Sequence, residues 1–150
     1  MAENWVERRF LREQNLNKAE DVWQAASTAI DDACKSFNTF YPAIGKAVFS
    51  PQNSHSILVE VTHEATKNVP MDTKRRVRIV FDGRRIAVAL DEHSARNYQI
   101  EADQERCFLK SGAREITPDE LSHLALEDAL FTPRNPNLPS SPPPRTGQWS

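Results

Sequence analysis

The sequence V77-R-I-V-F-D-G-R-R-I-A-V-A-L90 decides the fold. Aliphatic residues alternate with arginines before an Asp-Gly pair and with alanines after it. Successive side chains of a strand point to opposite faces, so an alternation of period two predicts strands with one apolar face. The stretch therefore predicts an antiparallel hairpin that is apolar toward the core and basic toward solvent.

Two turns are compatible with this hairpin. The Asp82-Gly83 pair favours a two-residue turn, in which Ile79 lies opposite Ile86. A four-residue loop would instead pair Phe81 with Ile86. Both loops contain an even number of residues, so the same side chains face the core in either register.

The pattern recurs downstream, where a turn at Asp103 would place Ile100 opposite Cys107. Segments 43–49 and 57–62 before the first hairpin and 115–116 after the second also have strand character. A polar loop is expected at 65–73. The sequence thus predicts an antiparallel meander of about five strands.

Helices flank this region. Asn4 with Glu7 predicts a first helix over 4–15, with Val6 and Phe10 on one face. Asn17 with Glu20 predicts the start of a second. That long helix ends near Pro42, and its apolar residues are Val22, Trp23, Ala26, Ala29, Ile30, Ala33, Cys34, Phe37 and Phe40.

A third helix opens at the sequence TPDE, residues 117–120. Thr117 is suited to the N-cap, Pro118 to the first turn, and Glu120 to closing a capping box. The predicted fold class is therefore α+β, with two N-terminal helices, the long one lying across one face of the meander, and one C-terminal helix.

The composition changes after the third helix. Six of the ten prolines lie in residues 132–150, which contain few large apolar side chains. Such a segment buries too little surface to offset its ordering entropy. We expect one domain over residues 1–131, followed by an extended, mobile tail over 132–150.

Composition restricts the class of protein. The chain has 150 residues with 39% hydrophobic and 27% charged residues, and its net charge of −2 indicates no dedicated nucleic-acid binder. No apolar run approaches the length of a membrane span, and the charged N-terminus is not typical of a signal peptide. Cys34 and Cys107 lie on predicted apolar faces, so we expect reduced, buried thiols and a cytoplasmic protein.

The hairpin carries a cluster of basic residues, which are Lys74, Arg75, Arg76, Arg78, Arg84 and Arg85. Guanidinium groups bind phosphates, so contact with an anion or with nucleic acid is one interpretation. However, Phe81 has core parity, which leaves no interleaved aromatic side chain for base stacking. A solvated strand face is the favoured interpretation, and we do not expect nucleic acid as a partner.

Small apolar residues share the outward face with these arginines. A strand facing water usually carries longer polar side chains, so alanines there indicate that something lies against the face. The third helix or a second subunit would serve. The candidate contact surface consists of Arg76, Arg78, Val80, Arg85, Ala87 and Ala89.

Polar residues at the predicted strand ends form an alternative site. His55 and His63 bracket the core-facing residues of one strand, and Glu64 follows directly; Asp91 and His93 come after the next hairpin. Converging strand ends would make them a metal or acid-base site. No known ligand spacing supports a metal there, and no nucleophile motif or phosphate loop occurs.

The leading hypothesis is a protein-interaction domain, an adaptor or chaperone-like protein or a homo-oligomer, with no catalytic residues and no cofactor. The alternative is a small-molecule-binding or hydrolytic cup that uses His55, His63 and His93. A third is anion or nucleic-acid contact through the hairpin. Phe37, Phe40, Tyr41 and Phe49 would line a pocket or, more simply, close the end of the core.

Overall fold

The computed structural model describes residues 4–66 and 72–132. The helices are α1 (Trp5–Leu16), α2 (Ala19–Phe40) and α3 (Pro118–Phe131). The strands are β1 (Gly45–Asn53), β2 (Ser56–His63), β3 (Thr73–Phe81), β4 (Arg85–Leu90), β5 (Arg96–Ala102), β6 (Cys107–Ser111) and β7 (Arg114–Ile116). Residues 133–150 of the predicted tail and 67–71 of the predicted loop lie outside the described residues.

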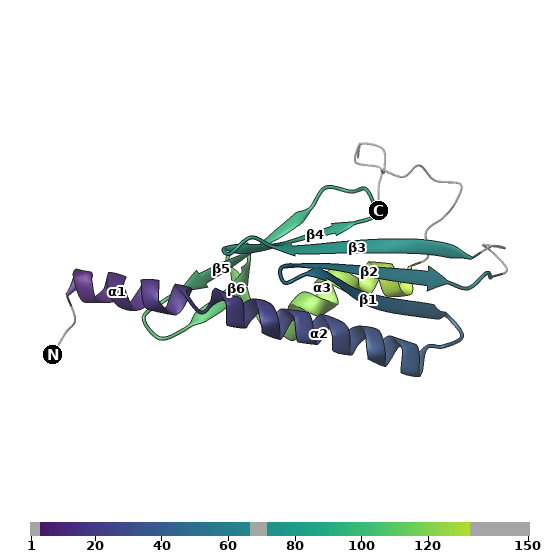
Figure 1. Cartoon of the computed structure of the whole chain (residues 1–150), viewed down its shortest axis with the longest axis horizontal. Coiled ribbons are helices and arrows are strands. Elements are labelled where there is room, and N and C mark those ends of the chain that lie inside the picture. The colour runs from purple at the N-terminus through teal and green to yellow at the C-terminus, as the bar shows by residue number, and fades with distance from the viewer. Residues whose placement is uncertain (1–3, 67–71, 133–150) are drawn as a thin grey trace.

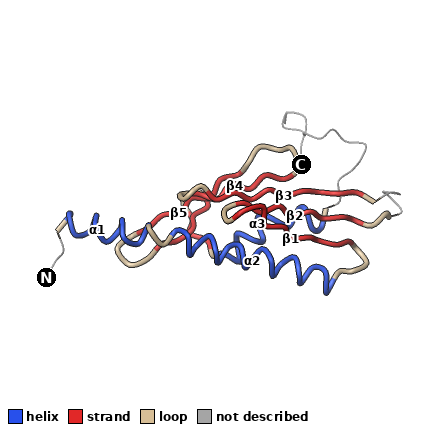
Figure 2. The backbone as a smooth tube through the Cα atoms, viewed as in Figure 1, coloured by secondary structure: helices blue, strands red, loops and turns tan. Residues whose placement is uncertain are grey.

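The predicted α+β class is confirmed. All strands form one antiparallel sheet in the order β1-β2-β3-β4-β5-β6-β7. The long helix α2 runs along the strands, while α1 projects past them at one end (Figures 1 and 2). The sheet has seven strands rather than about five. None of the described helices has the length and apolarity required to cross a bilayer.

One face of the sheet packs on the helices. Residues of α2, α3 and the inward side of every strand form a single buried cluster. Along β3 the alternation is strict, so Val77 and Ile79 are buried while Arg76 and Arg78 are exposed. The predicted parity of the hairpin is therefore confirmed, and α2 and α3 share the same side of the sheet.

The buried side of α2 consists of Ala19, Trp23, Ala26, Ile30, Cys34 and Phe37. Trp23 anchors it, because its ring stacks on Phe81 and its Nε1 donates to the carbonyl of Ser54 at 2.8 Å. Phe40 differs from the prediction. It is 74% exposed, because the last turn of α2 carries it past the core.

The N-terminal helices begin at different types of cap. The side chain of Asn4 accepts from the backbone N–H of Glu7, as predicted. The predicted box of Asn17 with Glu20 is wrong. Asn17 is the C-cap of α1, and α2 begins after Lys18 without a side-chain cap.

Both central hairpins have a register shifted by two residues from the two-residue-turn prediction. Phe81 pairs with Ile86, and Ile100 pairs with Leu109. The cause is an aspartate that begins each loop. The Asp82 carboxylate accepts from the backbone N–H groups of Arg84 and Arg85, and Asp103 accepts in the same way from residues 105 and 106. The same side chains still face the core, because each loop still contains an even number of residues.

The edge strand β1 extends beyond the predicted 43–49. Pro51 fits in it because an edge strand has no neighbour on one side that requires an N–H donor. At its other end Gly45 lies so close to β2 that a Cβ atom would clash with the carbonyl oxygen of Thr62.

Helix α3 is capped at both ends. The Thr117–Glu120 capping box forms as predicted, with Pro118 in the first turn. The C-terminal carbonyls are met from the sheet: His63 Nε2 donates to Ala129 at 2.6 Å, and Arg75 Nη1 donates to Thr132 at 2.9 Å. A cation suits the negative end of the helix dipole.

Candidate partner-binding face

The face of the sheet opposite the helices carries the hairpin's outward residues. Leu58 pairs with Arg78, and Arg78 pairs with Ala89, so these three side chains form one row across β2, β3 and β4. Val80 and Ala87 form the next row. We call this surface the open-face patch, and it consists of Leu58, Arg76, Arg78, Val80, Ala87 and Ala89.

The patch is open to solvent. Val80 is 37% exposed, and Leu58, Ala87 and Ala89 are half-buried between their longer neighbours. The suggestion that the third helix covers these alanines is wrong. Helix α3 packs against α2 and contributes its apolar residues to the core on the other face.

The charges on this face are unevenly paired. Arg76 donates to the Glu60 carboxylate at 2.9 Å. The side chains of Arg78 and Lys74 form no hydrogen bond or ion pair with any other described residue. Both are exposed, and with Arg76 they occupy three of the four outward positions of β3, the fourth being Val80.

Arg85, the remaining predicted contact residue, lies at the turn beside the patch. It forms an ion pair with Asp82 at 2.9 Å. The backbone N–H of Arg84, together with the Arg85 side chain, lowers the pKa of Asp82. Arg85 therefore holds the turn, and its charge is largely balanced locally.

A hollow of about 310 Å³ lies on the open face beside the patch. Its lining is Leu58, Lys74, Arg76, Arg78, Asp91 and Glu92. The Asp91 carboxylate already accepts from Arg75 and from the backbone N–H of Arg76. The hollow is thus mainly polar: Leu58 lies among three cations, and Glu92 adds an acid beside Asp91, so the excess of cations complements an acidic ligand.

The sequence interpretation missed three features of this region. Leu58 and Lys74 line the hollow, and their outward parity was the available signal. Arg75 has the parity of Val77, and it is buried rather than solvated. Its Nη2 lies 3.0 Å from Asp91 Oδ2, so the guanidinium group is compensated inside the protein.

The two histidines at the ends of β2 in the predicted polar site lie far apart. His55 and His63 flank opposite ends of the eight-residue strand β2, which is about 26 Å long at 3.3 Å per residue. His55 lies against Glu20 at 2.9 Å, and His63 is buried against α3. The structure therefore does not bring these two imidazoles together.

The other members of that site lie in turns. Glu64 is exposed and continues from β2, and its N–H donates to the Ile44 carbonyl. Asp91 has a φ of 54° at the end of β4, where it binds Arg75. His93 is half-buried in the same turn. Within residues 4–66 and 72–132, no three metal-binding side chains form a group that could hold a metal ion.

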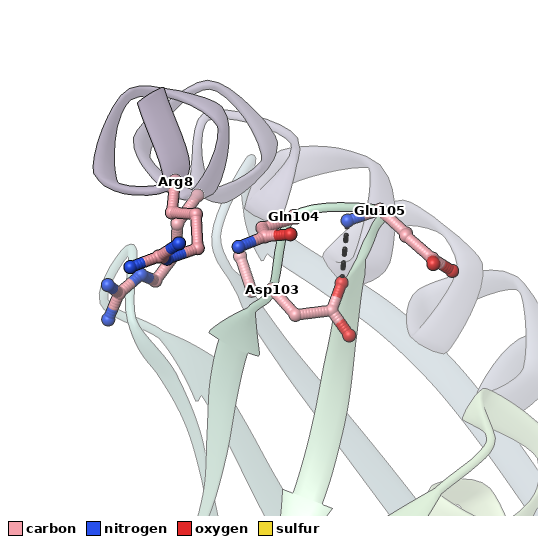
Figure 3. Close-up of a pocket in the computed structure, with 6 residues that line it drawn as sticks. Arg8, Asp103, Gln104 and Glu105 are labelled. Carbon is pink, nitrogen blue, oxygen red and sulfur yellow. Dashed lines mark hydrogen bonds between the residues drawn. The ribbon is translucent and has the colours of Figure 1, made fainter. Parts of the chain in front are cut away.

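A hollow of about 520 Å³ lies between α1 and the β5–β6 turn. Arg8 extends from α1 toward this turn, where Asp103 accepts from the N–H of Glu105 (Figure 3). The backbone N–H groups of Glu105 and Arg106 lower the pKa of Asp103. This wide, polar hollow marks where α1 meets the domain.

Comparisons with protein-family models, with curated proteins and with solved structures found no match for this chain. The fold and the side chains on its surface are therefore the basis for a function.

Proposed function

We propose that this chain is a protein-interaction domain that binds an acidic, partly apolar protein segment across the open-face patch. The observation that carries the proposal is the pair of half-buried alanines, Ala87 and Ala89, on a sheet face that α2 and α3 leave uncovered. Short side chains there leave the backbone of β4 accessible, so a partner can approach closely.

The apolar part of the patch supplies contact area. Leu58, Val80 and the two alanines are neighbours across three strands. Apolar surface stabilises association by about 25 cal/mol per Å² removed from water. A shallow platform of this kind fits a segment lying across the strands.

The cations of the patch indicate that the partner segment carries negative charge. Lys74 and Arg78 have no acidic partner among the described residues, and they border the hollow of about 310 Å³. Carboxylates of a partner would satisfy them, and Arg would bind such groups in bidentate geometry. The binding is expected to weaken with salt, because exposed ion pairs are screened.

A quantitative pull-down from lysate of the source organism tests this function, comparing the wild type with Arg76→Glu/Arg78→Glu. A matched control, Lys18→Glu/Lys35→Glu, makes the same change in net charge on exposed positions of the α2 region. We expect a partner that the wild type and the control retain, and that the patch variant loses by about tenfold or more in affinity.

Equal capture by all three proteins would contradict the proposal. Capture that nuclease treatment abolishes would assign the cations to nucleic acid instead. We further propose that the protein works in a reducing compartment such as the cytoplasm, since Cys34 and Cys107 are both free thiols.

A further inference from the structure

Exposed large apolar side chains concentrate on two surfaces away from the open-face patch. Nine are exposed among the described residues. Three of the nine lie on α1 and three line a groove between α2 and α3; in chain order these are Trp5, Val6, Phe10, Phe40, Tyr41 and Phe131. Two exposed apolar surfaces on one chain can bind each other when two copies of the protein meet.

Helix α1 turns its apolar side away from its own domain. Its inner side is attached through Asn15, which is buried and donates to the Asp103 carbonyl at 2.9 Å. Val6 and Phe10 are i, i+4 neighbours on the other side, and Trp5, 67% exposed, flanks them. We call these three residues the α1 face.

The α2–α3 groove is apolar and aromatic. Its volume is about 260 Å³. Phe131 stands edge-on to the rings of Phe37 and Tyr41, and Phe40 forms the outer wall. Three of the four aromatics predicted for a pocket, Phe37, Phe40 and Tyr41, therefore line this groove, while the fourth, Phe49, packs against the core.

We propose that the α1 face of one copy inserts into the α2–α3 groove of a second copy, and that the contact is reciprocal. The protein is then a two-fold dimer in which each subunit donates a helix and receives one. This assembly is separate from the binding proposed for the open-face patch, because it uses different residues.

The apolar chemistry of the two surfaces matches across this contact. An amphipathic helix commonly binds a groove through apolar anchors one turn apart, as Val6 and Phe10 are. Of the arginines of α1, Arg9 is paired with Glu13, and Arg8 and Arg12 line the hollow between α1 and its own domain. The rim of the groove carries Asp119 and Glu127. The match between the two surfaces is therefore apolar, and the ion pairs Arg9–Glu13 and His123–Glu127 lie beside it.

The arrangement along the molecule suits reciprocity. Helix α1 projects at one end of the long axis, and the C-terminal end of α2, which forms the groove, lies toward the other end (Figure 1). A two-fold axis that sets the long axes antiparallel places each α1 near the partner's groove. Both contacts then form at once.

The available area is sufficient. A stable dimer buries about 1,200 Å² or more in total, so each of the four surfaces must contribute about 300 Å². An aromatic side chain buries about 150–250 Å² when fully covered, so the exposed parts of Trp5 and Phe10 approach that value together, and Val6 adds to it.

Analytical ultracentrifugation of the full chain tests the dimer at concentrations up to about 100 µM, since association follows mass action. The wild type should sediment at twice the 17.0 kDa of one chain. Phe10→Glu removes the helix anchor, and Phe40→Glu blocks the groove. Both side chains are mostly exposed, so circular dichroism should show folded proteins, and each variant alone should be monomeric.

Mixing the two variants gives the decisive result. Phe40→Glu retains an intact α1 face and Phe10→Glu an intact groove, so one of the two contacts can form. The mixture should therefore associate at least about tenfold more tightly than either variant alone. A mixture that stays monomeric, a monomeric wild type, or variants that remain dimeric would each overturn the proposal.

Val48→Glu is the control, because Val48 is exposed on β1 outside both surfaces. It should leave the dimer intact, and loss of the dimer would assign self-association to the sheet. Arg76→Glu/Arg78→Glu should also remain dimeric. Failure of the dimer and failure of the patch are thus separate results.

Discussion

Neighbouring arginines on β3 have opposite environments because strand parity places them on opposite faces. Arg75 is buried, where it meets Asp91 and the carbonyls that end α3. Arg76 is exposed and pairs with Glu60. Residue type alone does not separate the two. Their positions relative to Val77 distinguish them: Arg75 lies on the same face as Val77 and has a structural role, whereas Arg76 lies on the opposite, solvent-facing side.

Replacing Arg75 with methionine should destabilise the fold by about 3–5 kcal/mol, because a buried carboxylate and the end of α3 lose their partner. Arg76→Met is the matched control, and it should change the free energy of unfolding by about 1 kcal/mol or less. Urea denaturation measures both. Comparable values for the two variants would show that Arg75 is not the internal partner of Asp91.

Burial also determines the chemistry of Cys34. Desolvation, with a smaller contribution from the Asp31 carboxylate, raises its pKa to about 12. The thiolate population at pH 8 is then about a thousandfold below that of an ordinary thiol.

Cys34 in a Cys107→Ser variant should therefore react with a disulfide reagent only after unfolding. The half-buried Cys107, whose pKa burial also raises, should react faster in a Cys34→Ser variant. Stopped-flow absorbance in native buffer and in urea measures the rates. Rapid labelling of Cys34 in native buffer would contradict its burial on the core side of α2.

At the scale of elements, the pattern of apolar residues identifies strands better than it identifies their pairing. The alternation in β3 and β4 places Val77 and Val88 on the core face for any connecting loop with an even number of residues. The register depends on Asp82, whose carboxylate binds two N–H groups of the loop. Asp103 repeats this arrangement, so an aspartate at the first position of a four-residue loop was a usable signal in both hairpins.

The N-terminus of α3 was predictable because its determinants are local. Thr117→Ala should destabilise the protein by about 1 kcal/mol through loss of the N-cap. Calorimetry or thermal denaturation measures the change. An unaltered melting temperature would mean that packing alone holds the start of the helix.

The same capping box predicts a dependence on pH. Arg114, with the backbone N–H of Thr117, lowers the pKa of Glu120. A carboxylate whose pKa is lowered by folding stabilises the protein above its unfolded value of about 4.3, and this stabilisation is lost as the pH falls through the folded value. The melting temperature of the wild type should fall more between pH 7 and pH 3 than that of Glu120→Gln. Identical slopes would exclude this contribution.

At the scale of the molecule, the sheet is asymmetric: two helices cover one face, and no helix of the described residues covers the other. Fold class and core were predictable because they follow from periodicity. The aromatic groove was only partly predictable, because Phe131 meets Phe37 and Tyr41 through a contact between distant helices. The dispersal of His55 and His63 follows from the length of β2, which separates residues that share one face.

The most direct test is site-specific photo-crosslinking in the organism of origin. Benzoyl-phenylalanine placed at Val80, in the open-face patch, should form a defined protein adduct, and Arg76→Glu/Arg78→Glu should abolish it. The same photo-reactive residue at Gln24, exposed on α2, should form none. Adducts from Gln24 alone, or equally from both positions, would contradict the claim that the open face of the sheet is the binding surface.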